Sequence, residues 1–337
     1  MRTLVGASRS GAIDAVRVVG VLAVVAGHTL ASPLVRPLFF TWHVPLFFFL
    51  AGYFWSARRS VKVELAKRAR TLALPYLTWF VLIAIVFIAF DLMPPRTAAG
   101  RLLEPFANGQ HSVMPLTTFW FVSVLFFSVV LLRFLQALPR TIVLLIAVAG
   151  LILGYWAGDT LSQTPLSIGS ALPCLIFILL GSAAKHLRPR IHRPAMTGLA
   201  LLLISAVLII SGASAPLDIK QGNFGTPVIS AVVAVMISFG LVLSAETVFS
   251  RLSGRASGVA TRISYTGFMV VLVHPLILWI IITFAPGVPS WIIFIAAAVV
   301  PMLLALALLR TNVSIWFTGA SRVTGVERSS RTTRPAK

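Results

Sequence analysis

Residues 13–29 read IDAVRVVGVLAVVAGHT, and residues 39–55 read FFTWHVPLFFFLAGYFW. By length and composition, both stretches predict membrane-spanning helices. They also carry polar residues that hydrocarbon disfavours, namely Asp14, Arg17, His28 and His43. A charged side chain at the centre of a bilayer costs about 2.5–3.5 kcal/mol on insertion scales. These polar groups are therefore expected to face the protein interior.

Arg17 and His28 are the two residues that define this interior face. Eleven positions at about 100° per residue bring them back to nearly the same side of a helix. The rise between them is roughly 16 Å, about half of a hydrocarbon layer of ~30 Å. The first span therefore presents an arginine near one side of the membrane and a histidine towards the other.

The composition of the whole chain points to a membrane protein. Of its 337 residues, 58% are hydrophobic and 11% are charged, and the mean hydropathy is +0.97, which excludes a soluble globular domain. A single cysteine, Cys174, excludes an internal disulfide framework, and no Cys/His spacing typical of a metal site occurs. No phosphate-binding loop, dinucleotide fingerprint or nucleophile-elbow motif occurs either. We expect no cleaved signal peptide, because the first span lacks a small-residue cleavage site.

Ten apolar segments predict an all-α, polytopic bundle of about ten transmembrane helices. They cover residues 12–31, 38–56, 71–91, 117–136, 141–157, 167–185, 196–213, 226–245, 264–285 and 290–309. The fifth is the shortest. The segment between the third and fourth, residues 92–116, is longer than an ordinary connection and contains Pro94, Pro95, Asn108 and Gly109. It is expected to be either a plain connector or part of an acceptor entrance.

The positions of the basic residues orient this bundle. With residue 1 inside, the inner segments hold 23 of the 28 lysines and arginines and the outer segments hold 4, with Arg17 left inside the first span. This asymmetry satisfies the positive-inside rule and predicts cytoplasmic N and C termini. The formal charge of +20 is then explained by topology and attraction to anionic membrane lipid, and no nucleic-acid partner is expected. Residues 1–11 form a cytoplasmic segment, 12–310 the membrane domain, and 311–337 a polar, disordered cytoplasmic tail.

His28 is the leading catalytic candidate. A neutral imidazole suits the removal of a hydroxyl proton, because its pKa lies near 6.5. The alternative is a structural histidine that bonds a neighbouring backbone carbonyl. Arg17 offers a fork of donors for a phosphate or a thioester-linked group. It can also simply pair with Asp14, three residues earlier, or extend towards the membrane surface.

The pair Arg17-x10-His28, preceded by Ile13-Asp14 and followed by HVPLFFFLAGYF, resembles the opening of the integral-membrane acyltransferase family 3. The resemblance implies transfer of an acyl group, usually acetyl, from an acyl-CoA to a hydroxyl of a sugar or other extracytoplasmic acceptor. It also implies that Arg17 and His28 are the signature pair of the site. Some relatives carry an added hydrolase-like domain after the helices, and residues 311–337, which follow the helices here, are expected to be too short to form one.

Arg68 and Arg70 match an Arg-x-Arg motif that this family associates with the acyl-CoA donor. Coenzyme A carries several phosphates, which bidentate guanidinium contacts suit. Cytoplasmic loops are basic in any membrane protein, however, and Arg58 and Arg59 lie close by. A donor site and ordinary topology therefore both explain this cluster.

Three further residues fall where the family has similar runs. His43, in the run Trp-His-x-Pro-Leu that resembles the sugar O-acetylase branch, is either an acceptor-side catalytic group or an ordinary residue of the membrane interface. Trp120 either stacks on a sugar or belongs to an aromatic belt. His274, followed by Pro275, is either catalytic or bonded to a carbonyl that the proline frees. Cys174 and Gly52 are expected to be packing positions.

These observations favour a membrane O-acyltransferase with acyl-CoA, most simply acetyl-CoA, as donor and a glycan or related hydroxyl compound as acceptor. The composition and the family type suggest the inner membrane of a bacterium. The main alternative is a secondary transporter or exporter, although no internal repeat of the kind seen in transporters is evident. A non-catalytic membrane scaffold is the third. The sequence carries no signal for oligomeric state.

Overall fold

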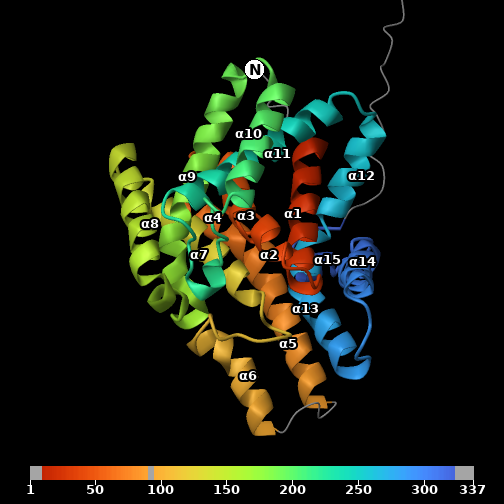
Figure 1. Ribbon diagram of the computed structural model, residues 1–337. Helices are drawn as coiled ribbons and strands as arrows, with labels where there is room; N and C mark the ends of the chain where they lie inside the picture. Colours follow the sequence, from red (N-terminus) through yellow and green to blue (C-terminus); the bar gives the residue numbers. More distant parts are fainter. Residues whose placement is uncertain (1–9, 90–94, 323–337) are drawn as a thin grey trace, which may run out of the picture.

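The computed structural model describes residues 10–89 and 95–322, and helices make up most of this part of the chain (Figure 1). The α-helices are α1 Gly11–Thr29, α2 Val35–Phe40, α3 Pro45–Tyr53, α4 Val61–Arg68, α5 Leu74–Ala89, α6 Pro95–Ala107, α7 Phe119–Leu135, α8 Arg140–Ser162, α9 Ala171–Leu187, α10 Pro194–Ile210, α11 Ile229–Phe249, α12 Gly254–Ser264, α13 Gly267–Phe284, α14 Ser290–Leu308 and α15 Ser314–Thr318. Among the described residues, the β-structure is one isolated bridge between Asp218 and Asn223. The predicted all-α fold is confirmed.

Eight described segments are long and apolar enough to cross a membrane. They are Gly11–Thr29, Val35–Tyr53, Val61–Ile88, Arg140–Ser162, Pro165–Arg190, Ile229–Phe249, Gly267–Phe284 and Ser290–Leu308. Two shorter apolar helices, α7 and α10, have 17 residues each. Together these ten elements fall on the ten predicted segments. The chain is a multi-pass helical membrane protein, while ten crossings and cytoplasmic termini stay predictions.

Two predicted spans differ in detail from the observed helices. The second is divided, because four turn residues separate α2 from α3 and Pro45 begins the new helix. Proline suits a first helical turn, where its missing N–H would have no partner anyway. The fifth segment, predicted as the shortest, is α8, which has 23 residues. Its polar C-terminal turns, around Asp159, lie outside the apolar run from which the prediction was made.

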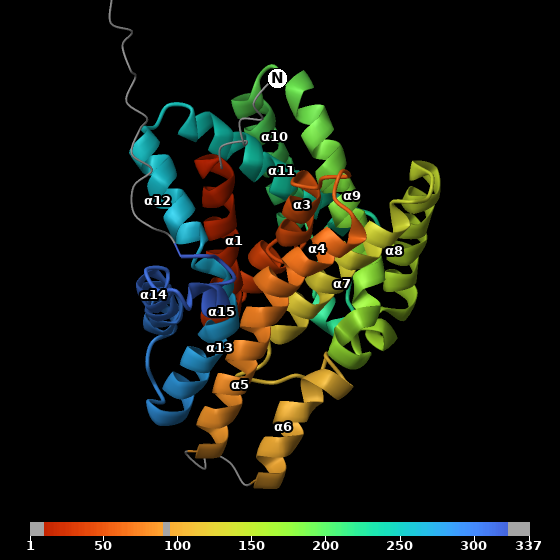
Figure 2. The ribbon, with the colours of Figure 1, turned by 180° about the vertical axis from the view of Figure 1, so that it is seen from behind.

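The long outer segment 92–116 is not a simple loop. Its described part contains α6, a helix of 13 residues, which lies beside α5 at one end of the molecule in both views (Figures 1 and 2). After α6 the chain turns back towards α7, where Thr117 and Thr118 lie beside the cavity described below. The sequence did not predict this helix, because Pro95, Gly100 and Pro105 interrupt its pattern.

The tail predicted to be disordered from residue 311 onward contains ordered structure in its first residues. Within 311–322, Ser314–Thr318 form α15, and Ser314 and Thr318 are buried. The indole of Trp79 on α5 donates a hydrogen bond to the carbonyl of Phe317 at 3.0 Å. Residues 323–337 of the predicted tail, and 1–9 of the predicted N-terminal segment, lie outside the described residues.

Helix α1 is packed against α11, α12, α13 and α14, and it lies between the α8–α9 side of the molecule and the α12–α14 side (Figures 1 and 2). The backbones of helices α3 and α9 approach each other closely. A Cβ added to Gly52 would lie 1.8 Å from the carbonyl oxygen of Ile178, and one added to Gly181 would lie 2.0 Å from that of Phe49. Glycines let helix backbones approach closely in membranes, so the predicted packing role of Gly52 is confirmed.

Candidate active site

A cavity of about 220 Å³ lies among α1, α2, the start of α3, α7, α13 and the loop before α11. Its lining combines histidines, charged groups and aromatic rings, and consists of Val24, His28, Arg36, Phe40, His43, Val44, Thr117, Thr118, Trp120, Phe121, Leu217, Asp218, Ile219, Lys220, Gln221 and Val271. The volume is several times the ~30 Å³ that one water occupies in the liquid. It suits one ring-sized polar group.

Three predicted site residues, from three separate elements, meet at this cavity. His28 comes from the last turn of α1 and is exposed to the cavity. His43, in the turn between α2 and α3, is 3% exposed, so it is not a surface residue of the membrane interface. Trp120, at the start of α7, is 7% exposed, and the aromatic-belt interpretation of this residue is therefore wrong.

Each of these histidines is anchored to its own helix or turn. The Nδ1 of His28 lies 2.9 Å from the carbonyl oxygen of Val24, and the Nδ1 of His43 lies 2.6 Å from that of Phe39. The structural bond that was the alternative to a catalytic role for His28 is therefore present, and His43 makes a bond of the same kind. It occupies one ring nitrogen of each histidine and leaves the other available for chemistry.

His274 on α13 lies directly behind His28. Its Nε2 is 3.3 Å from the Nδ1 of His28, and the two ring centroids are 5.2 Å apart. His274 is fully buried, and its Nδ1 lies 3.0 Å from the carbonyl oxygen of Val270. The sequence named both histidines, but their pairing across 246 positions is a tertiary contact.

The carbonyl that Pro275 frees is satisfied by a neighbouring helix. Proline has no N–H, so the carbonyl of Val271, four residues earlier, lacks its usual helical partner. The hydroxyl of Thr118 donates to that oxygen at 2.8 Å. This bond joins α13 to the start of α7 beside the cavity, and the Nδ1 of His274 lies 3.0 Å from the adjacent carbonyl oxygen of Val270.

Charged residues that the sequence did not single out border the cavity. Arg36 donates to Asp218 at 2.8 Å, and the Lys220 ammonium donates to the carbonyl oxygen of Ser112 at 2.6 Å and to the hydroxyl of Thr117 at 2.8 Å. Burial lowers the pKa of Lys220 to about 8, although the carboxylate of Asp218 acts in the opposite direction. The only available signal was that charges are rare in the predicted outer segments.

Arg17 does not line the cavity. It bonds Asp14 at 2.5 Å, and its guanidinium lies 4.8 Å from the ring centroid of Phe54, beyond the end of α3. Asp14 is fully buried and also accepts from Ser264 at 3.1 Å. His28 contacts Phe40 of α2 on the same side of α1. Arg17 and His28 thus both project towards the second predicted span, about 16 Å apart along the helix.

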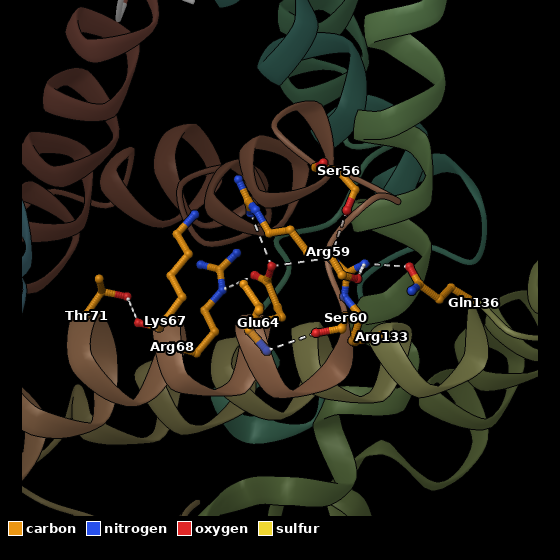
Figure 3. A network of polar contacts seen from close by, with 10 residues as sticks. Ser56, Arg59, Ser60, Glu64, Lys67, Arg68, Thr71, Arg133 and Gln136 are labelled. Carbon is orange, nitrogen blue, oxygen red and sulfur yellow. Dashed lines mark hydrogen bonds and ion pairs between the residues drawn. The ribbon is translucent and has the colours of Figure 1, made fainter. Parts of the chain in front are cut away.

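Arg68 belongs to a network around the buried carboxylate of Glu64 on α4 (Figure 3). Its Nε lies 2.8 Å from Glu64, and Arg59 and Arg133 contact the same carboxylate at 3.1 and 3.3 Å. Arg70 is exposed and follows in the π-helical turn Ala69–Ala73. π-helical turns are rare in proteins, and those that occur are often found at functional sites. The predicted donor motif therefore joins one anchored arginine to one open to solvent.

Arg133 on α7 is a residue that sequence reasoning missed. It is 2% exposed, stacks 3.9 Å from the ring centroid of Trp55, and donates to the carbonyl oxygens of Arg59 and Ser56 (Figure 3). From the sequence it was only one more basic residue at a cytoplasmic helix end. No cluster that could hold a metal ion occurs among the residues of 10–89 and 95–322.

The fold and cavity define a multi-pass helical membrane protein with a histidine pair at a polar internal site. The family model of the acyltransferase domain Acyl_transf_3 matches residues 10–310. The chain belongs to this family and is an acyltransferase. It is also 30% identical over 138 residues to the nodulation protein NolL of Mesorhizobium japonicum. That match spans 40% of this chain and 35% of NolL. No solved structure matches the chain.

Proposed function

We propose that the protein is a membrane O-acyltransferase that moves an acyl group, most simply acetyl, from cytoplasmic acyl-CoA to a hydroxyl of a glycan or related acceptor. The acceptor is bound on the extracytoplasmic side of a bacterial inner membrane. The observation that carries this proposal is the exposed imidazole of His28 in a cavity bordered by hydrogen-bonding groups and an indole.

His28 is the general base of the proposed reaction. The hydroxyl proton of the acceptor passes to the imidazole while the oxygen forms its bond to the thioester carbonyl carbon. The carbon–sulfur bond then breaks, and the thiolate leaves and takes up the proton. Cys174 is fully buried and does not line the cavity. This favours direct transfer over an acyl-cysteine intermediate.

The cavity is the acceptor end of the proposed site. Its volume of about 220 Å³ is below the 300–1,000 Å³ typical of pockets for drug-sized ligands, so it suits a sugar ring and an acyl group rather than a whole coenzyme. Trp120 offers an aromatic face to such a ring, and Lys220 and Gln221 offer donors to its hydroxyls. His43 is proposed as a second acceptor-side contact.

The donor enters from the opposite side in this proposal. Arg70 and the neighbouring Arg68 bind the phosphates of coenzyme A, and Arg17 orients the thioester-bearing arm on its way to His28. The roughly 16 Å between Arg17 and His28 along α1 suits the extended pantetheine arm of an acyl-CoA. The concentration of basic residues in the predicted inner segments supports this direction of entry.

The proposal is tested by substituting His28→Ala in the purified protein and following thiol release from acetyl-CoA. Loss of a positioned base should lower turnover by about 10²- to 10⁴-fold. His186→Ala is the matched control, because His186 makes the same bond to the carbonyl four residues earlier, at 2.7 Å, but is exposed and does not line the cavity. Near-normal turnover in His28→Ala would remove its role as base.

A second experiment separates an acyltransferase from an exporter. Coenzyme A should protect the detergent-solubilised protein against heat, because an exporter of glycans has no need of a site for it. Arg70→Ala should reduce this protection, whereas Arg58→Ala, which changes another exposed arginine ten residues before Arg68, should leave it unchanged. Absence of protection in the unaltered protein would favour the exporter.

A further inference from the structure

We infer that His274 is a positioning residue that holds His28 as the Nδ1–H tautomer, so that the Nε2 of His28 is the atom that accepts the hydroxyl proton. This inference rests on the proposed role of His28 as general base. It assigns a function to the 3.3 Å contact between the two imidazoles. It also specifies which ring nitrogen must meet the acceptor.

The backbone partners determine where the hydrogens lie. A peptide carbonyl accepts hydrogen bonds and cannot donate them. The Nδ1 of His28 lies 2.9 Å from the carbonyl of Val24, so that nitrogen carries a hydrogen. The Nδ1 of His274 lies 3.0 Å from the carbonyl of Val270 and carries one for the same reason. A neutral imidazole has only one N–H, so both Nε2 atoms hold lone pairs.

The lone pair on the Nε2 of His274 is directed at the hydrogen on the Nδ1 of His28. That hydrogen therefore has two acceptors, the carbonyl of Val24 and the imidazole of His274. Moving it to the Nε2 of His28 would leave a nitrogen lone pair facing both a carbonyl oxygen and another lone pair. The tautomer is thus fixed by two independent contacts from two helices.

The contact strengthens when His28 takes up a proton. During transfer, the acceptor proton binds the Nε2 of His28, the ring becomes an imidazolium, and its Nδ1–H bond to His274 becomes charge-assisted. His274 itself gains and loses no proton. The other titratable and charged groups that border the cavity beside His28 are His43, Lys220, Asp218 and Arg36. None of these bonds its Nδ1 in the described structure.

His274 is itself held rigidly, as a positioning residue must be. It is fully buried on α13, and its ring is fixed by the bond to Val270. One residue further on, Pro275 leaves the carbonyl of Val271 to Thr118, which fastens this turn of α13 to α7. Both tethers lie within one turn of the imidazole, so the distance to His28 is set by two helices rather than by a loop.

The test compares two substitutions at this position. His274→Leu removes the accepting nitrogen, whereas His274→Gln places an amide oxygen, which can also accept a hydrogen bond, at a similar distance from the backbone. Acetyl transfer by the purified full-length protein is measured with acetyl-CoA as donor and n-octyl β-glucoside as hydroxyl acceptor. His186→Leu, at an exposed histidine with the same backbone bond, is the control.

We expect His274→Leu to lower kcat by roughly 10- to 100-fold while both KM values stay within about threefold of normal. His274→Gln should keep most of the activity. In a His28→Ala background, His274→Leu should cost nothing further, because His274 acts only through His28. A purely structural role would instead lower the thermal midpoint, affect both variants alike, and add its loss to that of His28→Ala.

Any of those three structural outcomes, or a normal kcat in His274→Leu, would overturn the inference. The proposed function fails separately. Normal turnover in His28→Ala would contradict the role of His28 as base, whatever His274 does. An inactive His28→Ala beside a fully active His274→Leu would contradict only the role of His274.

Discussion

Two polar regions of this membrane protein, the cavity and the Glu64 network, differ in the sequence distance that their hydrogen bonds span. Around the cavity, His28, His43 and His274 each bond a carbonyl four residues earlier on their own chain segment. Around Glu64, Arg133 donates bonds to Arg59, Ser56 and Glu64 that join segments 69 to 77 positions apart. The first arrangement orients side chains locally, and the second fastens α4, α7 and the turn after α3 together.

This difference in bonding suggests that the cavity region serves catalysis, whereas the Glu64 network stabilises the fold. Because the histidines are anchored locally, the surrounding helices can leave a cavity beside them without losing their bonds. The Glu64 network, by contrast, is closed, and the side chains of Glu64 and Arg133 are each 1% exposed. We therefore expect substitutions in the cavity to alter acyl transfer and substitutions in the Glu64 network to alter stability.

The largest effect should follow from Glu64→Gln. Removing the carboxylate leaves the buried guanidinium of Arg133 without its counter-charge, and breaking a buried pair in this way typically costs about 3–5 kcal/mol. The thermal midpoint in detergent should fall strongly, while the KM for the acceptor in the remaining folded protein stays unchanged. Glu104→Gln is the control, since the Glu104 side chain is 35% exposed. An unchanged midpoint in Glu64→Gln would show that the network does not stabilise the fold.

Gly52→Ala should have the next largest effect. Helix α3 begins beside the cavity and ends beside the Glu64 network, so its contact with α9 supports both regions. The new Cβ would overlap the backbone of Ile178, and overpacking of this kind typically costs about 1–3 kcal/mol. Both acyl transfer and the thermal midpoint should therefore fall.

The control for Gly52→Ala is Gly258→Ala on the exposed helix α12, where an added Cβ would meet no atom within 4 Å. There the change should stabilise the protein by about 0.4–1 kcal/mol, because alanine restricts the unfolded chain. Equal effects of the two substitutions would contradict close packing of α3 on α9.

Much of the fold follows from the sequence because it depends on local composition. Apolar length gave the ten helical segments, and the close approach at Gly52 follows from its place in an apolar helix. Helix α6 could not be predicted in the same way. Its prolines and glycine oppose a helix locally, and its position beside α5 is a tertiary contact.

The sequence identified most residues of the candidate site, but it could not show which of them contact one another. His28, His43 and Trp120 were each conspicuous as polar or amphipathic groups in apolar runs, and they share one cavity. Lys220 and Arg133 were counted only as topology signals, because a charge near a helix end has the same appearance whether it is solvated or buried. Their partners, Ser112 and Glu64, lie far away in the sequence.

The pH dependence of the acceptor KM should show whether Lys220 takes part in acceptor binding. With a pKa of about 8, the ammonium is charged below pH 8 and loses its proton as the pH rises beyond it. Its bonds to Ser112 and Thr117 should then weaken, and the acceptor KM should rise about 2- to 10-fold between pH 7 and pH 9.5, the equivalent of one ordinary hydrogen bond. Lys220→Arg should stay flat over this range, because arginine remains protonated. A flat profile in the unaltered protein would remove Lys220 from acceptor binding.

The smallest effect should follow from Arg36→Gln, and it tests the contrast most directly. Arg36 pairs with Asp218 at 2.8 Å, about as close as Arg59 is to Glu64, but its side chain is 58% exposed. Solvent screens such a pair, so its loss should cost no more than about 1 kcal/mol and less still at high salt. Arg59→Gln, the same substitution beside a buried carboxylate, should lower the thermal midpoint more. If Arg36→Gln proved the more damaging of the two, burial would not be what distinguishes the regions, and the cavity border would itself support the fold.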